Sequence, residues 1–206
     1  MRVTTHALGH AFDGLPSLFE GLSTTMEPGH VYALTGPSGS GKSTLLGILA
    51  GWIQPAMGSV RREGVEKVGW IFQNPHGVAR RTALDHVSYA YLVEGVPRAE
   101  AEERGLTLLE RFGLLESRAK QFRALSGGEA QRLMLARGIA TSPDLLLVDE
   151  PTAQLDLRTA ATASEALGKI ATAGTIIVVA THDQRTKDAC TDVIDLSAFN
   201  AAGVAA

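Results

Sequence analysis

The stretch Gly36-Pro37-Ser38-Gly39-Ser40-Gly41-Lys42-Ser43-Thr44 fills every position of the pattern G-x-x-x-x-G-K-[ST]. In this pattern the backbone N–H groups of a loop surround a polyphosphate, and glycine keeps Cβ atoms out of the way. Lys42 is expected to reach the β- and γ-phosphates, and the Ser43 hydroxyl is expected to ligate Mg²⁺. The stretch therefore predicts a site for ATP or GTP.

The residues on either side of this loop fit a strand before it and a helix after it, as the pattern requires. Residues 31–35 are a short apolar run that ends at the loop. Residues 42–50 indicate a helix, whose N-terminus would add unpaired N–H donors and a partial positive charge. A glycine- and serine-rich linker can match the pattern by chance, but this context argues against a linker.

Length and composition indicate one globular domain, residues 1–206, with 45% hydrophobic and 20% charged residues. With the phosphate loop, we expect a single ATPase domain. The net charge of −3 provides no overall positive electrostatic field that would attract nucleic acid, so no nucleic-acid partner is expected. No apolar run approaches the roughly 18 residues that cross a bilayer. The N-terminus lacks the apolar core of a signal peptide, and the single Cys190 cannot form an internal disulfide. We therefore expect the protein to be located in the cytoplasm.

The order of apolar runs predicts an α/β fold. Residues 2–35 contain short β-rich pieces, and 59–62 and 67–72 indicate two more strands. Residues 82–94, 97–112 and 129–140 indicate helices, inserted as a lobe at about 76–141. From residue 145 onward strands (145–149, 175–180, 193–196) alternate with helices (157–172, 184–190). This alternation predicts a parallel sheet that is covered on both faces.

The buried strand at 145–149 ends in two carboxylates, Asp149 and Glu150. Downstream of a phosphate loop, Asp149 is expected to hold Mg²⁺ beside Ser43, directly or through water. Glu150 is expected to point beyond the γ-phosphate and to polarise an attacking water. The alternative is an Asp-Glu turn that caps the next helix.

Residues 125–132, Leu-Ser-Gly-Gly-Glu-Ala-Gln-Arg, resemble the signature motif of ABC ATPases. In that family the motif lies between a glutamine-containing loop and an Asp-Glu pair, as it does here. The small residues Ser126, Gly127 and Gly128 at a helix start also indicate a second anion site on physical grounds. Glu129 stands where glutamine is commoner in the family. The resemblance implies that residues 126–129 contact ATP.

Other motifs of the ABC family have counterparts over residues 2 to about 196. Gln73 resembles the Q-loop glutamine, which contacts Mg²⁺ and the attacking water. His182 resembles the switch histidine at the γ-phosphate, and Phe12 resembles the aromatic residue that stacks on adenine, although a core aromatic is the alternative for Phe12. Residues 153–156 resemble the D-loop, in which Gln154 replaces the usual small residue or asparagine.

The resemblance implies a P-loop NTPase fold with a mostly parallel core sheet, an N-terminal antiparallel β subdomain and the helical lobe. It also implies a head-to-tail dimer, in which the signature of one subunit meets the phosphate loop of the other, with a homodimer expected. The other partner would be a separate integral membrane permease, which would contact residues 74–94. Tyr89 and Tyr91 in this region are either surface aromatic residues that suit such a contact or core residues of a helix. The subunit would then lie on the inner face of the membrane. The sequence most resembles the lipoprotein-releasing and macrolide-exporting subfamily.

Three other functions use related machinery. DNA-repair and chromosome ATPases of ABC type carry long coiled coils between the Q-loop and the signature, but here Gln73 and Ser126 are only 53 residues apart with no heptad array. Ribosome-associated ABC factors usually have two such domains in one chain. A small-molecule kinase with a phosphate loop would lack the signature and the switch histidine.

Overall fold

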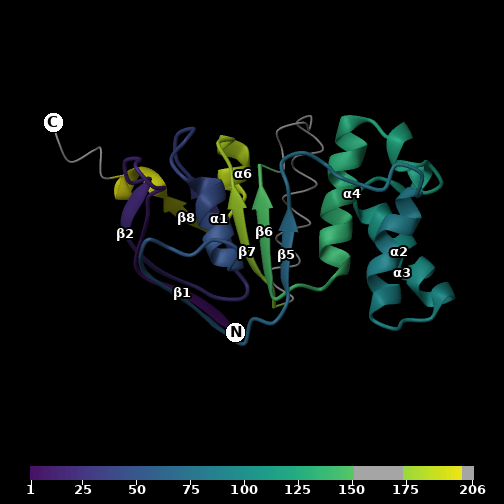
Figure 1. Ribbon diagram of the computed structural model, residues 1–206. Coiled ribbons are helices and arrows are strands. Elements are labelled where there is room, and N and C mark those ends of the chain that lie inside the picture. The colour runs from purple at the N-terminus through teal and green to yellow at the C-terminus, as the bar shows by residue number, and fades with distance from the viewer. Residues whose placement is uncertain (151–173, 201–206) are drawn as a thin grey trace.

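A computed structural model describes residues 1–150 and 174–200 of the chain. Its centre is a five-stranded parallel sheet (Figure 1). The strands lie in the order β5 (Val68–Ile71), β6 (Leu145–Asp149), β7 (Ile176–Ala180), β3 (Val31–Thr35) and β8 (Asp192–Asp195). Because all five strands run the same way, the loops that follow β3, β5, β6 and β7 meet at one edge of the sheet.

A three-stranded antiparallel sheet lies at the N-terminal side of the molecule (Figure 1). Its central strand is β1 (Arg2–His10), flanked by β2 (Phe19–Met26) and β4 (Met57–Glu63). The register of β1 shifts between Thr5 and Leu8, where Ala7 has a φ of 44°. Such an irregularity bends a strand and increases its twist.

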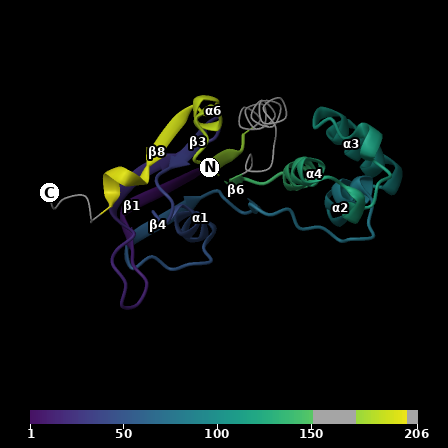
Figure 2. The ribbon, with the colours of Figure 1, turned by 90° about the horizontal axis from the view of Figure 1, so that it is seen from above.

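The helices of the described residues form two groups. α1 (Lys42–Ala50) and the short α6 (Gln184–Asp188) lie beside the parallel sheet. α2 (Ala83–Val93), α3 (Arg98–Arg111) and α4 (Gly127–Ala140) lie together beyond β5, on the side away from the antiparallel sheet (Figures 1 and 2). The 3₁₀ turns are η1 (Leu115–Ser117), η2 (Phe122–Ala124) and η3 (Leu196–Phe199). Within the described ranges, no helix is both long and apolar enough to cross a membrane.

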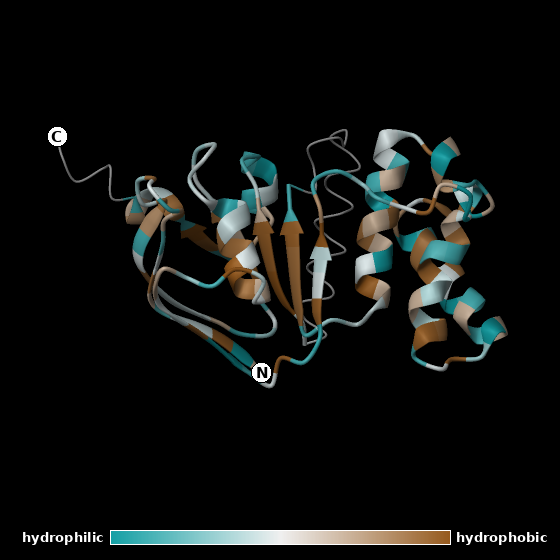
Figure 3. Ribbon diagram, in the orientation of Figure 1, coloured by the Kyte–Doolittle hydropathy of each residue, from teal (hydrophilic) through white to brown (hydrophobic). Residues whose placement is uncertain are grey.

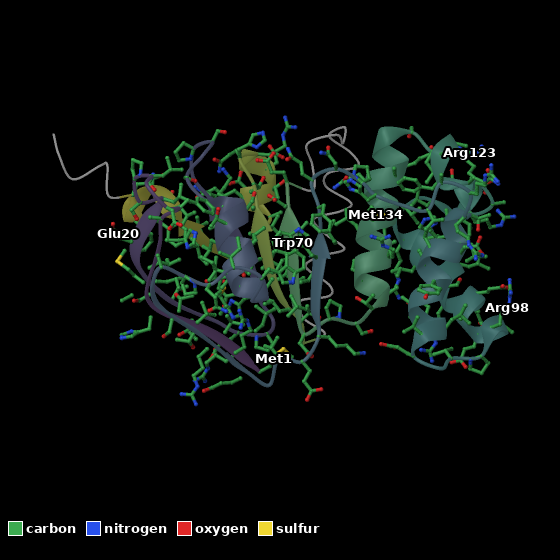
Figure 4. All side chains as sticks on the ribbon, in the orientation of Figure 1. Met1, Glu20, Trp70, Arg98, Arg123 and Met134 are labelled. Atoms are coloured by element: carbon green, nitrogen blue, oxygen red, sulfur yellow. The ribbon has the colours of Figure 1, made fainter. Side chains whose placement is uncertain are left out.

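The strands of the parallel sheet place alternate residues in two separate cores. Leu145 and Leu147 pack on the side of α1, and Leu146 and Val148 pack on the side of α2, α3 and α4. All four are fully buried, and each contributes about 1.5–3 kcal/mol by leaving water. β6 and β7 are hydrophobic along most of their length (Figure 3). Trp70 of β5, labelled in Figure 4, packs against the core on the α1 side.

The predicted fold class is confirmed, since a parallel core, an antiparallel β subdomain and a helical lobe are all present. The boundaries differ in places. The helix expected at 129–140 begins at Gly127, because Ser126 caps it, and the strand expected at 59–62 extends over Met57–Glu63. The helix expected at 184–190 ends at Asp188. The helix expected at 157–172 and the tail at 201–206 lie outside the described residues.

Candidate active site

The phosphate-binding loop joins β3 to α1 in a conformation that needs glycine. Gly36 and Gly41 have φ values of 145° and 92°, which favour glycine. A Cβ on Gly36 would lie 2.6 Å from Oγ of Ser40, which is too close. Gly41 caps α1 without a side-chain hydrogen bond, and no acidic residue lies in the first turn. The positive end of α1 is therefore available to an anion.

Lys42 is buried at the centre of this loop. Its ammonium group donates hydrogen bonds to the carbonyl oxygens of Gly36 (2.9 Å) and Pro37 (3.1 Å). A phosphate oxygen is a stronger acceptor for an ammonium group than a peptide carbonyl is. The Lys42 ammonium group therefore places a positive charge where the loop would hold phosphate.

Ser43 and Asp149 lie together at the end of β6, where the Ser43 hydroxyl donates a hydrogen bond to the Asp149 carboxylate. Burial raises the pKa of Asp149, while this hydrogen bond and the charge of Lys42 only partly oppose the rise. The Asp149 carboxylate is half-buried and its charge is only partly compensated by the chain, which suits a bound cation. Among the described residues no group of three or more acidic, His or Cys side chains forms a metal cage. Mg²⁺ usually combines one or two protein ligands with phosphate oxygens and water, so Ser43 and Asp149 are the residues here that could contact it.

Glu150 holds a strained backbone conformation directly after β6. Its φ is 46°, unusual for a residue with a side chain, and such a conformation costs about 1–3 kcal/mol. The Glu150 N–H donates to the carbonyl oxygen of Ala180 at 2.9 Å, which ties the turn to the end of β7. The strained turn projects a carboxylate that is 20% exposed.

Two predicted site residues contact the Glu150 carboxylate from the neighbouring strand ends. Nε2 of Gln73, two residues after β5, donates to Oε2 over 3.0 Å. Nδ1 of His182, two residues after β7, lies 3.1 Å from Oε1. The three side chains therefore converge, as expected for loops at one edge of a parallel sheet.

A cavity of about 780 Å³ contains this constellation and the phosphate loop. The predicted residues that line it are Phe12, Ser38, Gly39, Gly41, Lys42, Ser43, Thr44, Gln73, Asp149, Glu150 and His182. Leu18 also lines it, and nothing in the sequence except its apolar character indicates a role for Leu18. Gly36, Pro37 and Ser40 support the loop without lining the cavity. The volume suits a nucleotide-sized ligand.

Phe12 lies at the rim of this cavity and is 48% exposed. The His10 ring contacts it edge to face, with the ring centroids 4.8 Å apart. The His10 carbonyl oxygen accepts the Leu18 N–H at 2.9 Å, which closes the loop that carries Phe12. An exposed aromatic face at the mouth of a polar cavity can stack on a nucleotide base.

The signature residues lie elsewhere and do not line this cavity. Ser126 caps α4, and Gly127 and Gly128 are the first two residues of the helix. Glu129 turns back to its own subunit: Oε2 accepts the Ser126 N–H (2.8 Å), and Oε1 accepts from Lys120 (2.9 Å). The D-loop residues 153–156 lie outside the described residues.

Phe72, the residue before Gln73, is part of an aromatic stack. The rings of Trp52 and Trp70 are parallel within 13° with centroids 4.5 Å apart, and Phe72 lies 5.6 Å from Trp70. Trp52 is 62% exposed although it follows directly on α1 and its C-cap Gly51. The stack connects the end of α1 to the strand that leads to Gln73.

A parallel sheet with a glycine-rich phosphate loop, a Ser-Asp pair and a braced carboxylate defines a nucleotide-binding protein of the P-loop class. The sequence profile of ABC transporters matches residues 19–153. The lipoprotein-releasing system ATP-binding protein LolD of Aquifex aeolicus is 37% identical over 182 residues, 81% of this chain and 81% of LolD. The chain belongs to the ABC transporter family.

Two further comparisons agree with this assignment. The uncharacterized ABC transporter ATP-binding protein Mb2593 of Mycobacterium bovis is 37% identical over 86% of this chain, which spans 58% of that relative's length. The solved structure of the dimeric ATP-binding cassette MJ0796, bound to ADP and Pi, matches with a TM-score of 0.82 at 25% identity. That match covers 94% of this chain and 93% of the other.

Proposed function

We propose that this chain is the ATP-binding and ATP-hydrolysing subunit of an ABC transporter. The observation that carries the proposal is the convergence of Gln73, Glu150 and His182 in the cavity that also contains Lys42. Hydrolysis of a phosphoanhydride needs a general base and a cation that binds phosphate. This cavity contains both, together with two side chains that orient the base.

In the proposed reaction, the loop amides, the start of α1 and Lys42 bind the triphosphate. Ser43 and Asp149 would hold Mg²⁺, which neutralises charge on the β- and γ-phosphates when bound. Glu150 takes a proton from a water whose oxygen attacks the γ-phosphorus. The bond from that phosphorus to the β–γ bridging oxygen then breaks, and its electrons leave with ADP. Gln73 and His182 hold the Glu150 carboxylate in orientation.

We propose that two copies associate head to tail, so that Ser126, Gly127, Gly128 and Glu129 of one meet the nucleotide of the other. Within residues 1–150 and 174–200, the starts of α1 and α4 are both suited to anions, and of these two only the start of α1 faces the cavity. The start of α4 therefore needs an anion from outside its own subunit. MJ0796, which shares the fold, is a dimer in its solved structure.

A separate membrane permease is proposed to contact the surface of α2. Tyr89 and Val93 are 67% and 68% exposed there, beside a cavity of about 600 Å³ that Tyr89 helps to line. Tyr91 instead packs against the core of the helical lobe, with the Arg104 guanidinium 5.8 Å from its ring centroid. Tyr89 is therefore the surface aromatic of residues 74–94. This contact would hold the subunit at the cytoplasmic face.

Relatives named as lipoprotein-releasing ATP-binding proteins support a place for this chain in the lipoprotein-releasing and macrolide-exporting subfamily. LolD of Aquifex aeolicus is matched over 81% of its own length. The methionine import ATP-binding protein MetN of Carboxydothermus hydrogenoformans is matched over only 54% of its length at 35% identity.

The deciding experiment is to purify the chain with the membrane protein that associates with it and to measure ATP hydrolysis with and without that protein. Hydrolysis that the membrane protein stimulates supports the proposal. Hydrolysis that responds instead to DNA or to ribosomes contradicts it and favours a non-transport ABC ATPase.

A further inference from the structure

The start of α4 contains a carboxylate at a position where the proposed dimer needs to attract phosphate. Ser126 and Glu129 form a reciprocal capping box: the Glu129 N–H donates to Oγ of Ser126 (3.2 Å), and the Ser126 N–H donates to Oε2 of Glu129 (2.8 Å). By helix geometry, the N–H groups of Gly127 and Gly128 have no acceptor within the helix. They are the donors that remain for an anion.

The second oxygen of Glu129 is held by two side chains from the segment before η2. Oε1 accepts a hydrogen bond from the Ser117 hydroxyl and an ion pair from Nζ of Lys120 at 2.9 Å. The Glu129 side chain is only 17% exposed. Burial opposes its ionisation, but the hydrogen bonds from Ser117, Ser126 and Lys120 together lower the pKa of Glu129 to about 2. The carboxylate is therefore ionised at neutral pH.

An ionised carboxylate at this position has two opposing effects. It stabilises the helix, because negative charge is favourable near a helix N-terminus. It also repels a second anion at the same helix end, since like charges in close proximity disfavour each other. Lys120 brings an equal positive charge to the same carboxylate, so the pair as a whole is neutral.

We propose that Lys120 is a positioning residue for ATP-driven dimerisation: its countercharge lets Glu129 brace the signature loop without repelling the triphosphate held by the partner subunit. This inference rests on the proposed head-to-tail dimer. In this proposal Glu129 holds the signature loop in place, and the N–H groups of Gly127 and Gly128 contact the phosphate.

The test uses the Glu150→Gln protein as its parent, with dimer formation measured by light scattering as MgATP is added. Lys120→Met keeps the aliphatic stem and removes the charge. It should raise the ATP concentration at half-maximal dimerisation about tenfold, the size expected for one uncompensated charge near a protein surface. The rise should shrink in high salt, which screens charges.

The second variant separates charge from structure. Lys120→Met combined with Glu129→Gln removes both charges but retains an acceptor oxygen for the Ser126 N–H, so dimerisation should return to within about threefold of the parent. Lys120→Arg keeps the charge and should also dimerise within about threefold of the parent.

Three results would overturn the inference. An unchanged midpoint in Lys120→Met, or a double variant that dimerises as poorly as Lys120→Met, overturns the inference alone; the latter shows that Lys120 is only a structural tie. A Glu150→Gln parent that stays monomeric with MgATP overturns the proposed function, and the inference with it.

Discussion

The side-chain amide of Gln73 donates a hydrogen bond to Oε2 of Glu150 over 3.0 Å, although the two residues are 77 positions apart in the chain. His182 contacts the other oxygen, so the carboxylate is held from both sides. A carboxylate held in one orientation is suited to act as a general base, because its geometry does not have to be established during the reaction.

Replacing Glu150 with glutamine should stop turnover and preserve ATP binding. The amide has nearly the same shape but cannot take a proton, and general base catalysis typically contributes 10²–10⁴-fold in rate, so phosphate release should fall at least about 100-fold. ATP-bound dimer should accumulate on size exclusion. Glu94→Gln, at an exposed ion pair with Lys67, is the matched control and should hydrolyse ATP normally. A Glu150→Gln protein with the normal rate would show that another group is the base.

Replacing Lys42 with alanine should weaken ATP binding. Charge-assisted hydrogen bonds contribute about 1.5–3 kcal/mol, so the Kd for MgATP should rise about 10- to 150-fold in calorimetry. Lys67→Ala removes an equal charge outside the cavity and should leave the Kd within about twofold. Unchanged affinity in Lys42→Ala would contradict the role of the phosphate loop.

Replacing Phe12 with alanine should raise the KM for ATP about tenfold and change kcat little. Base–aromatic stacking contributes about 1–3 kcal/mol, and it acts on binding rather than on the chemical step. Phe12→Tyr keeps the stacking face and should restore the KM. Leu15→Ala, at a 63% exposed residue of the same loop, controls for loop disturbance. If Leu15→Ala raises the KM as much as Phe12→Ala does, the effect belongs to the loop.

Replacing Tyr89 with glutamate should reduce co-purification of the membrane partner, because a charge is introduced into an apolar contact surface. The measurement is the ratio of the two proteins after affinity purification, with an expected drop of about tenfold. Val193→Glu makes the same kind of change at a 47% exposed residue of β8 and should leave the ratio unchanged. Equal ratios for the two variants would place the contact elsewhere.

Acidification should destabilise the chain through His86. Burial lowers the pKa of His86, with smaller lowering by Arg137 and Arg81 and opposing contributions from the Thr82 carbonyl and Asp85. Its Nε2 accepts the Val78 N–H at 2.9 Å, which requires the unprotonated form. Because the folded pKa lies below the unfolded value near 6.5, this contribution is complete above that value and is lost as the pH falls through the folded pKa.

Thermal unfolding between pH 7.5 and pH 5 measures this effect. His86→Phe keeps a ring beside Phe122 and removes the titrating group. It should be less stable than the parent at pH 7.5, and its Tm should fall less on acidification. Equal falls in the two proteins would assign the pH dependence to other groups.

Much of this site could be predicted from the sequence, because its parts lie at positions that parallel strands define. The phosphate loop, the Asp-Glu pair and His182 each follow an apolar run, and the carboxyl ends of parallel strands meet at one edge. Gln73 was placed by its resemblance to a family motif, and the structure puts it in contact with Glu150.

Other contacts could not be predicted, because no periodic pattern encodes them. Ser117 and Lys120 lie in an irregular segment with 3₁₀ turns, where local spacing does not show which side chains turn toward α4. The sequence predicts that α4 begins at Glu129, two residues later than it does, because glycine disfavours helix while the Ser126 cap outweighs that preference. Leu18 reaches the cavity only through the closure of its loop by His10.

The stack of Trp52, Trp70 and Phe72 has a practical consequence. The chain has only two tryptophans, and both are in this stack, next to the strand that ends before Gln73. Their ultraviolet emission therefore comes from a single place in the molecule. The protein therefore carries its own optical reporter for that strand, and any change there on addition of ATP can be followed in real time without attaching a dye.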